Sequence, residues 1–251
     1  MNSISKIEWT KTTWNPVTGC SKYSLGCKNC YAERFAKRLQ AIGYEAYRNG
    51  FEVRIHEEFL NRPLKVKSPK MIFVNSMSDL FHDAVPFSFI EKVFFIMNKA
   101  SWHIFQILTK RSERLLELSS ELPWAPNIWA GVTVEHYNYL SRIEHLSRTD
   151  AAIKFISCEP LLSPIHNLNL ESIDWVIVGG ESGPGARPMN KSWVTGIRDQ
   201  CLSCNVPFFF KQWGGFNKKR AGRLLDGKVY DEMPCPINMK PTQLNFNLHT
   251  A

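Results

Sequence analysis

The sequence has no apolar run that approaches the roughly 18 residues needed to span a membrane. It also shows no export signal near its start, where Lys6, Glu8 and Lys11 interrupt the few apolar residues. No low-complexity linker divides its 251 residues, a length that suits one large domain. We therefore expect a cytoplasmic protein without a membrane partner.

Cysteine is sparse, and the seven residues are an odd number placed unevenly along the chain. Disulfides are not favoured, because thiols stay reduced in the cytoplasm. Three of the seven, Cys20, Cys27 and Cys30, fall within one short stretch. A structural zinc site takes four ligands, whereas a [4Fe–4S] cluster held by three cysteines leaves one iron open to another ligand. The three thiols favour such a cluster, and zinc completed by a distant histidine or cysteine is the alternative.

Cys201 and Cys204 also have the spacing of a metal-binding pair. No second pair accompanies them, so buried thiols are favoured over an auxiliary cluster.

Acidic residues are outnumbered, with 23 Asp and Glu against 31 Lys and Arg, which gives a net charge of +8. This excess permits an anionic partner such as a nucleotide or nucleic acid, but it does not require one. Trp14, Trp129 and Trp213 lie near predicted strand ends, where their rings could stack on a base or pack in the core.

Short apolar runs alternate with helical stretches, which is the order of repeated βα units. The predicted strands are residues 12–14, 71–75, 103–108, 128–132, 153–157, 175–178 and 207–211. The predicted helices are residues 31–42, 87–100, 112–122, 137–146 and 192–201. We therefore predict an α/β fold, a partial TIM-type βα barrel over residues 1–215, with 43–70 as an insertion. Residues 216–251 are hydrophilic and contain prolines, which predicts a small C-terminal cap or hairpin.

Polar side chains follow most of the predicted strands. They are Ser76 and Asp79, Thr109 and Lys110, Glu135, Cys158 and Glu159, and Gly179, Gly180 and Glu181. In a βα barrel the carboxyl ends of the strands meet at one rim, so these residues should face the cysteine loop, residues 20–30. We expect Glu159, Glu181 and Cys158 to serve catalysis, although Cys158 could equally be packed in the core. The glycines of residues 179–185 could cradle a phosphate or form a tight turn.

The cysteine region resembles that of radical S-adenosylmethionine (SAM) enzymes, particularly the branch that includes spore photoproduct lyase. The matching motifs are Asn-Pro-x-x-Gly-Cys at residues 15–20 and Cys-x-x-Cys-Tyr-Ala at residues 27–32. Radical SAM enzymes usually have three residues between the first two cysteines, whereas this chain has six. The chain is therefore similar to a variant with a three-residue insertion. The longer gap also resembles that of the phage-associated three-cysteine-motif family, an uncharacterised group whose remaining signature resembles residues 158–162 and 179–189.

This resemblance implies a radical SAM-like barrel in which Cys20, Cys27 and Cys30 hold a [4Fe–4S] cluster. SAM would bind the open iron, and an electron from a flavodoxin- or ferredoxin-like donor would cleave it to methionine and a 5′-deoxyadenosyl radical. Lys110 resembles the lysine that meets the SAM carboxylate, and Ser76 and Asp79 could accept hydrogen bonds from the SAM amino group or ribose.

The other residues expected to contact the cofactor are Thr109, Glu135, Gly179 and Gly180. The Gly-Gly-Glu of radical SAM enzymes follows the second strand, whereas residues 179–181 follow the sixth, so Glu181 is assigned to the substrate instead. The resemblance also implies the host cytosol as the location if a phage or prophage encodes the chain.

No motif fixes the substrate, and a nucleotide or nucleic acid is plausible. The alternative function is that of a non-catalytic phage protein that binds nucleic acid and is stabilised by zinc or an iron–sulfur cluster.

Overall fold

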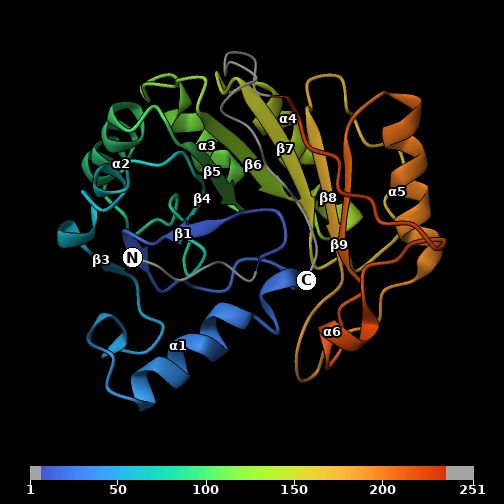
Figure 1. The fold of residues 1–251 in the computed structure, drawn as a ribbon, viewed down its shortest axis with the longest axis horizontal. Helices are drawn as coiled ribbons and strands as arrows, with labels where there is room; N and C mark the ends of the chain where they lie inside the picture. The colour runs from blue at the N-terminus through green and yellow to red at the C-terminus, as the bar shows by residue number, and fades with distance from the viewer. Residues whose placement is uncertain (1–6, 236–251) are drawn as a thin grey trace.

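Seven parallel strands form one curled sheet in the computed structural model, which describes residues 7–235 (Figure 1). The sheet has the shape of half a barrel, and its strand order is β1-β4-β5-β6-β7-β8-β9. The bounds are β1 (Thr12–Trp14), β4 (Met71–Val74), β5 (Ile104–Thr109), β6 (Ile128–Thr133), β7 (Ile153–Cys158), β8 (Trp175–Gly179) and β9 (Phe208–Gln212). Each neighbouring pair is parallel, so all seven carboxyl ends lie on one side. The predicted α/β class and its strand sequence are confirmed.

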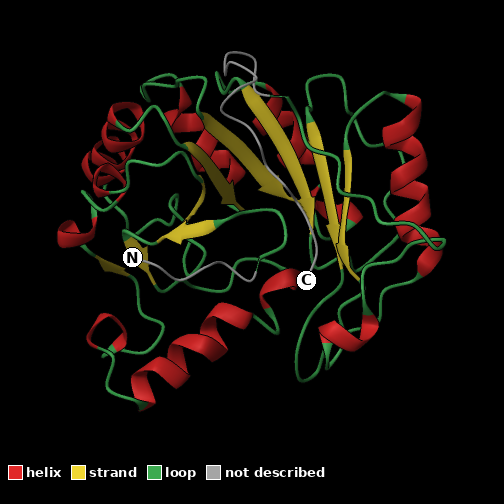
Figure 2. Cartoon of the chain, viewed as in Figure 1, coloured by secondary structure: helices red, strands yellow, loops and turns green. Residues whose placement is uncertain are grey.

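Helices cover the outer face of this sheet (Figure 2). The helices are α1 (Tyr31–Ala41), α2 (Phe87–Lys99), α3 (Ser112–Ser119), α4 (Ser141–Ser147), α5 (Lys191–Ser203) and the short α6 (Lys218–Ala221). In α2, Ile90, Val93, Phe94 and Met97 recur at helical spacing and are all buried, as the sequence predicts. Figure 2 shows α1 apart from α2–α5, below the carboxyl ends of the strands.

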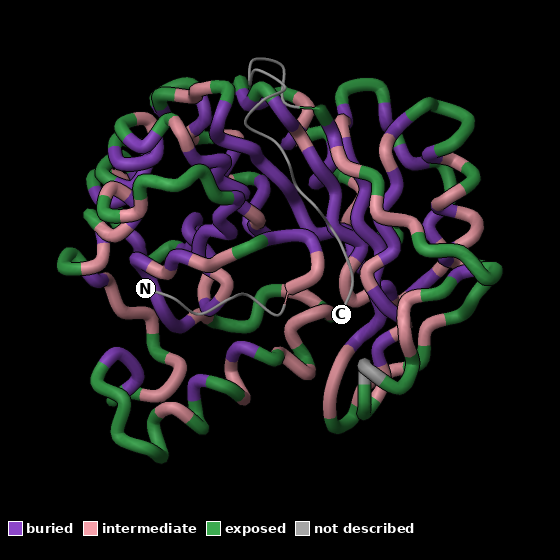
Figure 3. Tube along the Cα trace, viewed as in Figure 1, coloured by how far each residue is buried: buried purple, intermediate pink, exposed green. Residues whose placement is uncertain are grey.

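Both faces of the sheet are buried, so most strand residues lie in one of two cores (Figure 3). The outer core joins alternate strand residues to α2–α5, and the inner core fills the concave face with aromatic rings. Burying one such large side chain contributes about 1.5–3 kcal/mol. Gly131 makes room in the inner core, because a Cβ there would lie 2.4 Å from the Phe155 ring.

The predicted insertion, residues 43–70, packs behind the cysteine loop. Its strand β3 (Arg54–Ile55) pairs antiparallel with β2 (Val17–Thr18), which ends two residues before the first cysteine. The amide of Cys20 donates to the carbonyl of Phe51 at 3.0 Å. Gly19 has a φ of +80°, and a Cβ there would lie 1.9 Å from the carbonyl oxygen of Glu52. The segment therefore fixes the path of the chain into the cysteine loop.

The segment that follows β9 returns along its outer edge. The amide of Phe210 donates to the carbonyl of Tyr230 at 2.9 Å, and Phe209 forms an antiparallel bridge with Asp231. The amide of Phe208 donates to the carboxylate of Glu232 at 3.0 Å. Of the predicted C-terminal cap, residues 216–251, the structure describes α6 and this return segment, and residues 236–251 lie outside the described part. None of the helices described is long and apolar enough to cross a membrane.

Candidate functional site

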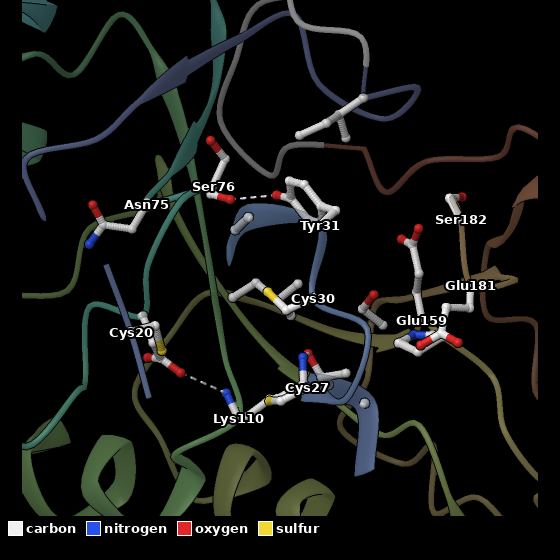
Figure 4. A pocket seen from close by; sticks show the side chains of 18 of the residues that line it. Cys20, Cys27, Cys30, Tyr31, Asn75, Ser76, Lys110, Glu159, Glu181 and Ser182 are labelled. Atoms are coloured by element: carbon white, nitrogen blue, oxygen red, sulfur yellow. Dashed lines mark hydrogen bonds between the residues drawn. The ribbon is translucent and has the colours of Figure 1, made fainter. Parts of the chain in front are cut away.

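A cavity of about 420 Å³ opens on the concave face at the carboxyl ends of the strands (Figure 4). This volume lies within the range of roughly 300–1,000 Å³ typical of ligand pockets. The predicted site residues that line it are Cys20, Cys27, Cys30, Ser76, Asp79, Thr109, Lys110, Glu159, Gly180 and Glu181. The parallel sheet therefore brings together side chains that are up to 161 residues apart in sequence.

The three thiols occupy one part of the cavity wall, and Figure 4 shows Glu159 and Glu181 across from them. Cys20 and Cys27 belong to the loop after β2, and Cys30 directly precedes α1. Within residues 7–235, no three His, Cys, Asp or Glu side chains lie close enough to hold a single metal ion. The cysteines of a cubane cluster bind different iron atoms, so they surround a volume instead of meeting at a point. The donor set, three thiols facing a shared cavity, fits such a cluster.

Cys20 lies against a buried ion pair. The guanidinium of Arg111 is 3.7 Å from the Cys20 sulfur and 3.4 Å from the Asp79 carboxylate, and it also donates to Ser21 Oγ at 2.9 Å. Burial, together with the negative charge of Asp79, raises the pKa of the Cys20 thiol to about 11, although Arg111 acts in the opposite direction. Binding of a metal by this thiol would therefore displace a proton.

Asp79 is held by groups at the end of β5. Its carboxylate accepts hydrogen bonds from Thr109 Oγ1 at 2.7 Å and from the backbone amides of Lys110 at 3.1 Å and Phe81 at 3.0 Å. The ammonium of Lys110 has a single hydrogen bond within the described residues, a long one of 3.4 Å to Thr133 Oγ1. Lys110 is thus free to turn toward a ligand, whereas Asp79 has a fixed orientation.

The remaining predicted residues, Glu135, Cys158 and Gly179, do not line the cavity. Glu135 lies beneath the cysteine loop, where it accepts from Arg142 Nη1 at 2.9 Å, from the amide of Gly26 at 3.2 Å and from Ser24 Oγ. Burial alone would raise the pKa of Glu135, but the charges of Lys110 and Arg142 outweigh it and lower the pKa. Glu135 therefore supports the loop from below.

Cys158 faces the outer core, because it alternates along β7 with Ser157 and Glu159, which face the cavity. Its thiol is fully buried, and this burial raises its pKa. The structure does not bring Cys158 to the cavity. Gly179 lies next to Glu159, whose carboxyl carbon would be 3.3 Å from a Cβ at this position.

Glu181 is fixed by its neighbours. Its carboxylate accepts three hydrogen bonds from Arg187 and one from Asn29 Nδ2 at 2.9 Å. Burial would raise the pKa of Glu181, but the hydrogen bonds from Arg187 and Asn29 prevail and lower it to about 2. Asn29 lies between Cys27 and Cys30, so Glu181 ties the cysteine loop to the loop that follows β8.

A second contact joins the same two segments. Arg34 of α1 donates to the carbonyls of Ser182 and Pro184, each at 2.7 Å. Asn29 Nδ2 also donates to the carbonyl of Gly185 at 2.8 Å. The cysteine loop and the glycine-rich loop therefore behave as one connected wall of the cavity.

Several further polar groups belong to the cavity, and the sequence assigns no role to them. Lys211 of β9 donates to Glu159 Oε1 at 2.6 Å, and the buried side chains of Trp9, Asn75 and Ser157 each have a polar atom without a hydrogen-bond partner within the described residues. Ser157 and Lys211 end two of the predicted strands, so strand-end position places them at the rim without giving them a function. Trp9 precedes the first strand, and no pattern marks it.

Searches of curated proteins and of solved structures gave no match to this chain. A family model described as "Protein of unknown function (DUF5131)" matches residues 4–234. Because this match covers most of the sequence, the chain belongs to the DUF5131 family.

Proposed function

We propose that this protein is a radical SAM-type enzyme whose partial TIM-type βα barrel holds a [4Fe–4S] cluster through Cys20, Cys27 and Cys30. The supporting observation is that the three thiols share one cavity with polar side chains from the ends of β4, β5, β7 and β8. A three-cysteine loop and strand-end residues on one cavity are what a cluster with an open iron and a bound cosubstrate require.

The cavity can bind SAM next to the thiols through residues of the chain. Lys110 would neutralise the SAM carboxylate, and Ser76 would accept a hydrogen bond from its amino group or ribose. Asp79 already accepts from four neighbouring donors, so its part would be to hold the end of β5 and Arg111 in place. With SAM bound and one electron from a flavodoxin- or ferredoxin-like donor, the cluster supplies reductive cleavage of SAM to methionine and a 5′-deoxyadenosyl radical.

The protein's own part in this reaction is to position the reactants and to shield them. Glu135 and Glu181 hold the cysteine loop at two points, through Gly26 and Asn29. Arg111 places a positive charge beside Cys20, where an electron-rich cluster would sit. The aromatic inner core below the cavity keeps water from one side of the reacting atoms.

The test begins with anaerobic purification and measurement of iron, sulfide and zinc. We expect a brown protein that releases 5′-deoxyadenosine when it is reduced in the presence of SAM. Alanine at Cys20, Cys27 or Cys30 should abolish iron binding, whereas alanine at the exposed Cys204 should not. Lys110→Ala should retain iron but bind SAM more weakly.

The alternative is a non-catalytic, metal-stabilised protein that binds nucleic acid. A colourless protein with stoichiometric zinc and no release of 5′-deoxyadenosine would contradict the enzyme proposal and support this alternative. Unchanged SAM affinity in Lys110→Ala would refute only the assignment of that lysine.

A further inference from the structure

The part of the cavity formed by β7 and β9 contains buried polar groups that bind nothing within residues 7–235. Ser157 Oγ and Trp9 Nε1 both line the cavity, are almost fully buried and have no hydrogen-bond partner. Buried polar groups in native proteins are nearly always paired with protein, water or ligand. Two such groups on residues that line one cavity therefore point to a ligand at this place.

Glu159 and Lys211 complete this part of the cavity. They come from β7 and β9, which are not adjacent, and they meet across β8 at 2.6 Å. Gly179 at the end of β8 allows this contact, because a side chain there would press against the Glu159 carboxylate. The pair is largely buried and lines the cavity. The absence of a side chain on β8 thus creates a polar site between two separated strands.

The charges at this site do not favour an anion. The Lys211 ammonium has the carboxylate of Glu159 at 2.6 Å and that of Glu8 at 3.9 Å, so two negative charges face one positive charge. Beside the thiols, Lys110 and Arg111 are matched by the carboxylates of Glu135 and Asp79. A phosphate or carboxylate would therefore be repelled from the Glu159 end.

The hydrogen-bonding capacity at the Glu159 end is mixed. Trp9 can only donate, and Ser157 can donate or accept. The Lys211 ammonium has three N–H groups and two carboxylate neighbours, so one N–H is left for a ligand. Glu159 Oε2 remains an acceptor, since the only hydrogen bond to this carboxylate within the described residues goes to Oε1. The apolar part of the cavity lining includes Trp9, Phe73 and Leu108.

We infer that this site binds a planar, neutral amide. Such a ligand carries a carbonyl and an N–H group on a flat apolar body. The carbonyl accepts from Ser157, Trp9 or Lys211, and the N–H donates to Glu159. The assignment of this ligand as the substrate rests on the proposed function, whereas the binding preference itself does not.

Three probes of matched size test the preference: benzamide, benzoate and benzamidine, which carry a neutral, a negative and a positive group on the same ring. Binding to the full chain, purified anaerobically with whatever metal it holds, is measured by saturation-transfer NMR titration. Benzamide should bind most tightly, because the two carboxylates repel benzoate and because benzamidine has no acceptor for the donors of Trp9 and Lys211. Ser157→Ala and Lys211→Met should each weaken it roughly threefold to tenfold, as expected for the loss of one hydrogen bond.

Ser182→Ala is the matched control, because Ser182 lines the same cavity but its hydroxyl is paired with Gln212 at 3.0–3.2 Å. Thermal unfolding verifies the fold of each variant, and Ser157→Ala should not lower the melting temperature, since it removes an unpaired group. Benzoate or benzamidine binding as tightly as benzamide would overturn the inference. So would undetectable benzamide binding, or benzamide binding that Ser157→Ala leaves unchanged.

The two proposals fail in different ways. A brown protein that cleaves SAM but prefers benzoate would overturn the amide site alone. A colourless zinc protein that prefers benzamide in a manner dependent on Ser157 would overturn the proposed reaction alone.

Discussion

Replacing Glu181 with glutamine tests whether one carboxylate holds the cysteine loop against the loop after β8. Glutamine keeps the shape of the side chain but removes the charge that three Arg187 donors and Asn29 share. We expect the variant to fold, to be less stable than the wild type and to retain metal less firmly.

The size of the effect follows from the contacts. A hydrogen bond to a charged group contributes about 1.5–3 kcal/mol. The pKa of Glu181 is lowered from an ordinary 4.5 to about 2. One pKa unit corresponds to about 1.4 kcal/mol, so the ionised carboxyl contributes on the order of 3 kcal/mol to the unfolding free energy. Because 28% of the Arg187 side chain is exposed, water screens the pair, and we expect a loss of about 2–3 kcal/mol.

The pH dependence has a defined sign. A carboxyl whose pKa is lower in the folded state stabilises the fold fully above its unfolded pKa and loses this contribution as the pH falls toward its folded pKa. The difference in unfolding free energy between wild type and Glu181→Gln should therefore be constant near pH 7. It should shrink as the pH falls from 4.5 toward 2, the interval between the two pKa values.

Urea unfolding monitored by tryptophan fluorescence measures this difference at pH 7 and at lower pH. Glu117→Gln, at an exposed position on α3, is the control and should change little at either pH. A second reading rests on the proposed cluster: if the protein holds iron, Glu181→Gln should lose it to a chelator faster, because Asn29 lies between two of the thiols. A difference that does not shrink at low pH would refute the linkage, and an unchanged rate of iron loss would refute the anchoring of the loop.

Two further predictions concern the ion pair beside Cys20 and the inner core. Arg111→Met should lower the unfolding free energy, measured by urea unfolding, by about 3 kcal/mol, because it leaves the buried Asp79 without its cation. Arg111→Lys should restore only part of the lost stability. Wild-type stability in Arg111→Met would contradict a stabilising role of this ion pair. Gly131→Ala should lower the unfolding free energy by about 1–3 kcal/mol through overpacking against Phe155. In a double-mutant cycle, adding Phe155→Leu should relieve part of this loss. Strictly additive losses of stability in the two variants would speak against a direct clash.

The sheet could be predicted from the sequence because each inner strand is a short run of apolar residues ending in polar or small ones. The expected strand at residues 128–132 and the observed Ile128–Thr133 differ by a single residue, and residues 12–14 coincide with β1. A parallel sheet buried on both faces gives such continuous apolar runs. The expected helix at residues 137–146 is instead a 3₁₀ turn, Tyr137–Tyr139, followed by α4.

The site was less predictable because its geometry depends on pairings between distant segments. Nothing in a linear pattern indicates that Glu159 pairs with Lys211 over the glycine at the end of β8. Nor does it indicate that Arg187 and Asn29 hydrogen-bond to Glu181. Strand-end position correctly brought most candidate residues to one cavity. It could not tell which of them bind a neighbouring side chain and which remain free for a ligand.

The return of the chain along β9 bears on how this protein avoids aggregation. A half-barrel has two open sheet edges, and unpaired edge groups invite pairing with other chains. The amides of Phe208 and Phe210 are already bonded to Glu232 and Tyr230, and β1 at the other edge is only three residues long. Neither edge offers a long template for a foreign strand, so the sheet can stay unclosed without presenting a row of free backbone groups to other chains.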